Sequence, residues 1–144
     1  MKILFDTNIV LDVLLDRKPF ADDAAYLFAA AQRGDLSGYL CSHTITTIYY
    51  LAKKAAGHKH AQAQVEKLLI LFEIAPVNRN VLAGALASKF DDFEDAVVHE
   101  AGMLVNAHGI VTRDDKGFKG ASISVYSPAE LAHIIRSKGD DRSL

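Results

Sequence analysis

The sequence predicts an α/β fold in which a parallel sheet is covered by helices on both faces. Two observations support this prediction. Short apolar runs, typical of buried strands, alternate along the chain with longer segments in which apolar residues recur at helical spacing. Most of these segments are bounded by polar, glycine or proline residues, which start or stop helices and strands. Parallel strands need crossover connections, and helices supply these on both faces of the sheet.

The composition fits one domain of ordinary size. The chain has 144 residues, of which 50% are hydrophobic and 24% are charged, enough apolar material for a single core. The net charge of −2 excludes a global basic footprint, although a local patch or a bound cation can still attract nucleic acid. The single cysteine, Cys41, excludes a disulfide framework and a cysteine-based zinc site. No apolar stretch approaches the roughly 18 residues of a membrane span, and no signal peptide is present, so we expect a cytoplasmic protein.

The first half of the chain is expected to hold two strands and four helices. The strands are the apolar runs 3–5 and 38–41. The helices carry apolar residues on one face and span 9–14, 20–32, 42–57 and 59–71. Pro19 precedes the second helix, and Gly34 and Gly57 end the second and third. Asp12 and Asp16 are assigned to the surface of the first helix, with the rim of a pocket as the alternative for Asp12.

The second half continues the alternation. Residues 72–76 form a short strand or an extended link, and helices are expected at 78–88 and 93–107, the second stopped by Gly109. Strands follow at 110–112 and, by its alternation, at the edge position 123–126. Ser127 and Pro128 then cap a last helix at 129–137. We therefore expect one domain over 1–137 and a disordered polar tail at 138–144.

Acidic residues gather at three places far apart in the chain. Asp6 and Asp114 each follow an apolar strand, where open α/β sheets place their ligands. Asp92 and Asp95 are three residues apart at the start of a helix, and therefore share a face. Helix capping is the alternative for two of these places. Asn8 would cap the first helix, which does not explain Asp6, and Asp92 is explained equally well as a cap or as a ligand.

Carboxylates that converge on one pocket repel one another unless some are protonated or a cation lies between them. Ligands that offer oxygen alone, without histidine or cysteine, suit the hard ions Mg²⁺ and Mn²⁺. Such ions activate a water molecule and stabilise the oxygens of an in-line phosphodiester displacement. If the acids meet, they therefore predict a metal-dependent phosphodiester-cleaving site.

Three segments in register, 5–12, 92–96 and 111–114, resemble the PIN domain, and especially the VapC-like ribonuclease toxins of bacterial toxin–antitoxin pairs. The resemblance covers essentially the whole chain. It implies a three-layer α/β/α sandwich around a mainly parallel five-stranded sheet. It also implies a metal-dependent endoribonuclease that acts on RNA, holds Mg²⁺ or Mn²⁺, forms a homodimer and binds a cognate antitoxin.

The same resemblance assigns roles to individual residues. The implied metal ligands and catalytic acids are Asp6, Asp95 and Asp114. The residues implied to support them are Asn8, Thr112 and Thr47. Further acids available to the pocket are Asp92 and Asp115.

Two positions depart from the family pattern. Many members carry a metal-associated Glu where this chain has Thr47, and many carry an Asp where it has Gly117. The loss of the Glu supports an alternative, a catalytically silent PIN-fold domain that binds RNA or protein. A haloacid-dehalogenase-like phosphate-transfer enzyme is a further alternative, because that family also begins with an Asp after the first strand. It needs a second Asp two residues later, where this chain has Asn8.

Overall fold

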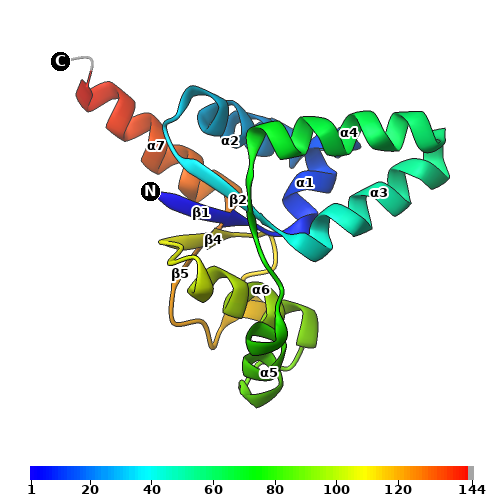
Figure 1. Cartoon of the computed structure of the whole chain (residues 1–144). Helices are drawn as coiled ribbons and strands as arrows, with labels where there is room; N and C mark the ends of the chain where they lie inside the picture. The colour runs from blue at the N-terminus through cyan, green and yellow to red at the C-terminus, as the bar shows by residue number, and fades with distance from the viewer. Residues whose placement is uncertain (143–144) are drawn as a thin grey trace.

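The computed structural model describes residues 1–142, which form a five-stranded sheet with helices on both sides (Figure 1). The strands are β1 (Lys2–Phe5), β2 (Ser37–Cys41), β3 (Glu73–Ala75), β4 (Gly109–Val111) and β5 (Ser124–Tyr126). Their order is β3-β2-β1-β4-β5, and all four pairings are parallel. The first strand of the chain is therefore the centre of the sheet, and the predicted parallel sheet is confirmed.

Seven α-helices connect and flank the strands within the described residues. They are α1 (Thr7–Leu14), α2 (Ala21–Arg33), α3 (Ser42–Ala56), α4 (His58–Leu71), α5 (Arg79–Ala87), α6 (Phe93–Leu104) and α7 (Pro128–Arg142). A short 3-10 helix, η1 (Lys116–Phe118), lies between β4 and β5.

The sheet separates two hydrophobic cores. Side chains alternate along a strand, so Ile3 and Phe5 pack with α1, α2, α3, α4 and α7, whereas Leu4 packs with α5 and α6 on the other face. All three side chains are at most 1% exposed. Figure 1 shows the two helical layers on opposite sides of the strands. The expected three-layer α/β/α sandwich is therefore confirmed.

Two boundary predictions are wrong. Helix α6 ends at Leu104, because Asn106 takes a left-handed conformation with a φ of 58°, and Gly109 begins β4 instead of stopping the helix. A Cβ at Gly109 would lie 2.6 Å from the ring of Tyr126 on the neighbouring strand, so only glycine fits there. Helix α7 continues to Arg142, so residues 138–142 are helical and not a disordered tail. Residues 143–144 lie outside the described part.

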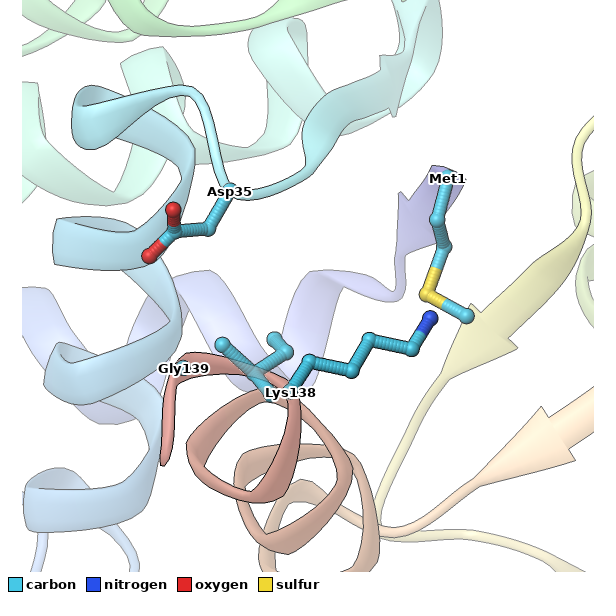
Figure 2. Close-up of a pocket in the computed structure, with 5 residues that line it drawn as sticks. Met1, Asp35, Lys138 and Gly139 are labelled. Atoms are coloured by element: carbon cyan, nitrogen blue, oxygen red, sulfur yellow. The ribbon is translucent and has the colours of Figure 1, made fainter. Parts of the chain in front are cut away.

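The amino end of the sheet offers only a small cavity. Met1, Asp35, Lys138 and Gly139 line it, and Lys138 extends across it toward Met1 (Figure 2). Its volume of about 20 Å³ holds roughly one water molecule. This cavity is therefore too small for a substrate. Within residues 1–142, no helix has both the length and the apolar character that crossing a membrane requires.

Candidate acidic site at the carboxyl ends of the strands

Three strands deliver their following residues to the same edge of the sheet. Asp6 comes directly after β1, Ser42 after β2 and Thr112 after β4. Because these strands are parallel and adjacent, the segments that follow them meet at one edge. This edge lies opposite the small cavity at Met1, which precedes β1.

Asp6 is buried, and its carboxylate is held from both sides. The residue as a whole is 7% exposed. Its Oδ1 accepts a hydrogen bond from the backbone N–H of Thr7 at 2.8 Å, and its Oδ2 accepts one from the hydroxyl of Thr112 at 2.8 Å. Asp6 is thereby the N-cap of α1, so the alternative in which Asn8 caps this helix is wrong.

Thr112 and Asn8 tie the loop after β4 to the start of α1. The Thr112 hydroxyl accepts hydrogen bonds from the backbone N–H of Asp114 at 3.0 Å and from Nδ2 of Asn8 at 3.4 Å. The amide oxygen of Asn8 accepts a bond from the backbone N–H of Arg113 at 3.4 Å. Thr112 itself has no exposed surface, and the three bonds are partly buried. The contacts place Asp114 beside Asp6 although 108 positions separate them in the chain.

The carboxylates of Asp95 and Asp114 both lie against the backbone of Gly117. A Cβ at Gly117 would lie 2.8 Å from Oδ2 of Asp114 and closer still to Oδ2 of Asp95, so any larger residue displaces the carboxylates. The backbone N–H of Gly117 donates to Oδ1 of Asp114 at 3.2 Å. The Asp that many PIN domains carry at this position therefore does not fit the present arrangement, and the departure at Gly117 has a steric reason.

The carboxylates of the site influence one another. Burial raises the pKa of Asp95 to about 7, and the charges of Asp6, Asp92, Asp114 and Glu94 add to the effect. Burial also raises the pKa of Asp6, while its two hydrogen bonds oppose the shift and the charges of Glu94 and Asp114 reinforce it. The structure thus brings Asp6, Asp95 and Asp114 together, with Glu94 as a further acid. We call Asp6, Asp95 and Asp114 the acidic cluster.

Three other predicted residues lie at the edges of this cluster. Asp92 is exposed and is the N-cap of α6, where its Oδ1 accepts from the backbone N–H of Asp95 at 2.9 Å. Asp115 is exposed at the start of η1. Thr47 is half-buried in α3 and lines a cavity with Glu94. The residue of α3 that contacts the first turn of α1 is Thr44, whose hydroxyl lies 2.8 Å from that of Thr7.

Sequence reasoning misplaced Asp12 and overlooked Glu94. Asp12 is fully buried, not on the helix surface, and pairs with Nε of Arg17 at 2.8 Å and with Nε of Arg113 at 2.6 Å. A weak signal was present, because Asp12 lies three residues after the buried Ile9 and shares its face. For Glu94 the only signal was its place beside Asp95 in the acidic run.

The donors of the acidic cluster suit a hard divalent cation in kind. They are carboxylate oxygens, and those of Asp95 and Asp114 approach the same point beside Gly117. Burial, and after it the negative charge of neighbouring acids, raises the pKa values of Asp6 and Asp95, and a bound cation would oppose both effects. Over residues 1–142, however, no three histidine, cysteine, aspartate or glutamate side chains are yet close enough to hold a metal ion. A cation would therefore have to draw the carboxylates together.

Comparisons with known proteins agree with this geometry. A family model described as PIN domain matches residues 2–116. No curated protein matches the chain significantly. The fold is similar to that of FitAcB from Neisseria gonorrhoeae, with 21% identity, 90% of this chain and 99% of that chain covered, and a TM-score of 0.67.

Two further solved structures share the fold. A toxin–antitoxin complex from Klebsiella pneumoniae has 21% identity, covers 88% of this chain and 97% of that chain, and gives a TM-score of 0.67. VapC20 from Mycobacterium tuberculosis, described as a sarcin-ricin loop cleaving toxin, has 16% identity. The match covers 75% of this chain and 86% of that chain, with a TM-score of 0.59. At these identities the likeness concerns the fold.

Proposed function

The chain belongs to the PIN domain family, and from this premise we propose that it is a metal-dependent endoribonuclease, the toxin of a toxin–antitoxin pair. The observation that carries the proposal is the acidic cluster, in which three carboxylates from separate parts of the chain surround the strand ends beside Gly117. A purely structural role does not explain this cluster, because Asp6 is buried without a cationic partner among its hydrogen bonds.

In the proposed reaction, Asp6, Asp95 and Asp114 would hold Mg²⁺ or Mn²⁺. When bound, such an ion activates water and stabilises the charge that develops on the phosphodiester oxygens. The remaining work belongs to the chain. Thr112 and the backbone N–H of Thr7 fix both oxygens of Asp6. Asn8 and Thr112 hold the loop that carries Asp114, so that two of the three acids keep a fixed spacing.

The experiment that tests the proposal is cleavage of a long RNA by protein freed of metal with EDTA. We expect cleavage only after Mg²⁺ or Mn²⁺ is added, and its loss in Asp6→Asn. The matched control is Asp22→Asn, an exposed acid on α2, which should cleave like the original chain. The activity must co-elute with the protein in gel filtration. Cleavage that survives EDTA or Asp6→Asn would refute the proposed role of the cluster.

A catalytically silent domain is the second candidate, because Thr47 stands where many relatives carry a Glu and the acids are not yet within metal-binding distance. Binding of RNA without cleavage at millimolar Mn²⁺ would favour it. The phosphate-transfer alternative has no support. The chain belongs to the PIN family, and it has Asn8 where a haloacid dehalogenase needs its second Asp.

We further propose that the chain forms a homodimer and binds an antitoxin, and that it acts in the cytoplasm. An apolar groove between α1, α3 and α4 supports a partner, since it is lined by Leu15 and Leu51, which are 58% and 40% exposed. Solved neighbours include toxin–antitoxin complexes, two of them bound to DNA. Light scattering at tens of micromolar should give twice the monomer mass, and a monomer there would contradict the dimer.

A further inference from the structure

A second cavity lies next to the acidic cluster, between α3 and α6. Its volume is about 250 Å³, somewhat below the roughly 300–1,000 Å³ of sites for drug-sized ligands. Its lining is mixed. The apolar part consists of Val77, Leu82, Phe93 and Val97, and the polar part includes His43 and Glu94. The cavity is therefore sized for one flat, partly apolar group with a polar edge.

His43 lines this cavity, and its ring nitrogens, which lie just beneath the cavity surface, have unused hydrogen-bonding capacity. Both of its ring nitrogens are buried, and neither has a hydrogen-bond partner among the described residues. Its Nε2 lies 3.6 Å from Oε1 of Glu94, slightly too far for a hydrogen bond. Buried polar atoms are rarely left without partners, because each unsatisfied group costs free energy. The His43 side chain is 26% exposed, so a turn of its ring would bring a nitrogen to the cavity, where a ligand would satisfy it beside the 63% exposed side chain of Glu94.

Glu94 links the cavity to the acidic cluster. Its charge raises the pKa values of both Asp6 and Asp95, so its carboxylate lies near theirs. Phe93 precedes it in α6, lines the cavity and is 49% exposed, although an aromatic ring of this size is normally covered. A polymer whose phosphodiester bond is held at the acidic cluster would therefore have a neighbouring unit within reach of this cavity.

We propose that the cavity receives an unpaired guanine base of the RNA, next to the bond that is cleaved. The inference rests on the proposed ribonuclease function. Proteins read single-stranded RNA by stacking bases on aromatic side chains and by hydrogen-bonding their edges. Phe93 supplies the stacking face, Val77, Leu82 and Val97 supply apolar walls, and His43 with Glu94 meets the edge of the base.

Guanine matches the two polar side chains better than the other bases do. Its edge carries the O6 acceptor, then the N1–H donor, then the N2 amino donor. His43 can donate to O6 while the two oxygens of Glu94 accept from N1–H and N2. Adenine and cytosine satisfy one donor and one acceptor and leave an oxygen of Glu94 unused. Uracil places a second carbonyl against that oxygen, which repels it.

The test measures base preference without cleavage, in EDTA and in an Asp6→Asn background. The trinucleotides UGU, UAU, UCU and UUU are titrated into ¹⁵N-labelled protein and followed by NMR. UGU should bind about tenfold tighter than the others, in line with a good bidentate base contact, and should shift the signals of His43, Phe93 and Val97. Because no metal or turnover is involved, the base preference is measured separately from the ribonuclease activity.

Three variants with matched controls locate the preference. Glu94→Gln and His43→Ala should each reduce the preference for UGU several-fold, and Phe93→Ala should weaken all four trinucleotides. The controls are the exposed residues Glu66→Gln, His133→Ala and Ile70→Ala, which should leave binding unchanged. Equal affinity for the four trinucleotides, or signal shifts that avoid α3 and α6, would overturn the proposal. A guanine preference that survives Glu94→Gln undiminished would also overturn it.

Discussion

Two buried acids, Asp6 and Asp12, lie within one helix length of each other but differ in their partners. Asp12, in α1, is fully buried and contacts two guanidinium groups, those of Arg17 and Arg113. Asp6, at the start of the same helix, is 7% exposed but contacts only a backbone N–H and a hydroxyl, and other acids raise its pKa further. We call Asp12 with its two arginines the ion-pair cluster.

The comparison separates an acid that holds the fold together from one that is left for chemistry. The ion-pair cluster balances its charge within the chain, and Arg113 also stacks 3.9 Å from the ring centre of Phe20. The acidic cluster is unbalanced, and such strained titratable groups are typical of functional sites. Removing Asp12 should therefore cost stability, whereas neutralising a member of the acidic cluster should cost function.

The largest expected effect is on stability. Asp12→Asn leaves two arginines without their carboxylate, and we expect the free energy of unfolding to fall by about 2–3 kcal/mol. This is below the usual cost of breaking a buried pair because the side chains of Arg17 and Arg113 are 38% and 27% exposed and can regain water. Urea denaturation measures the loss. Asp16→Asn, an exposed partner of Lys18, is the control and should change stability by less than about 0.5 kcal/mol.

The second prediction concerns metal. Mn²⁺ should stabilise the metal-free protein by about 2.7 kcal/mol at a hundredfold excess over its Kd, which corresponds to roughly 5–10 °C in Tm. Asp6→Asn should abolish this rise and leave the metal-free protein equally stable or slightly more stable. Asp12→Asn should lower the metal-free Tm yet retain the rise. If both variants lose the metal response, or both keep it, the distinction between the two clusters is wrong.

The third prediction adds an acid beside the cluster. Thr47→Glu places a carboxylate in the cavity that Glu94 lines, where the family's Glu is missing. Calorimetry should show Mn²⁺ binding tightened by about 1–2 kcal/mol if the new charge reaches the ion. The metal-free Tm should fall because like charges approach. A variant unchanged in both respects would mean that Thr47 does not face the metal.

The smallest expected effect is a dependence on pH. The pKa of Asp95 is about 7 in the folded chain against an ordinary value of 3.8, so the folded state binds the proton more tightly than the unfolded state. Stability should therefore fall as the pH rises from about 4 to about 7, by roughly 1 kcal/mol once solvent screening of this part-exposed side chain is allowed for. Asp95→Asn should remove this slope from the metal-free melting curve. Parallel pH profiles for the two proteins would contradict the shift.

The acidic cluster could be predicted from sequence to the extent that its signals are local. An apolar run followed by an acid is visible at β1 and again at β4, so Asp6 and Asp114 stand out without a structure. Asp95 stood out by its spacing from Asp92 at the start of a predicted helix, and the family resemblance then assigned it the role of a metal ligand. The parallel sheet with helices on both faces follows from the alternation of strands and helices, whereas the strand order was not predicted.

The parts that could not be predicted depend on partners far away in the chain or on which way a helix turns. Asp12 is buried because Arg113 reaches it, and 101 positions separate the two. Glu94 and Asp95 are neighbours on α6, and only the packing of that helix determines that both contribute charge to the site. The end of α7 was missed because its last residues are polar, and helical spacing gives no signal there.

The position of β1 at the centre of the sheet also determines when the acidic cluster is assembled during synthesis. Asp6 leaves the ribosome before Thr112, whose hydroxyl orients the carboxylate of Asp6 and lies 106 residues later in the chain. At roughly 5–20 residues per second, translation separates the two by several seconds. A nascent chain that has emerged only through α6 already holds Asp6 and Asp95, yet it lacks β4 and Asp114. The acidic cluster is therefore incomplete until β4 and the loop that carries Asp114 have been made.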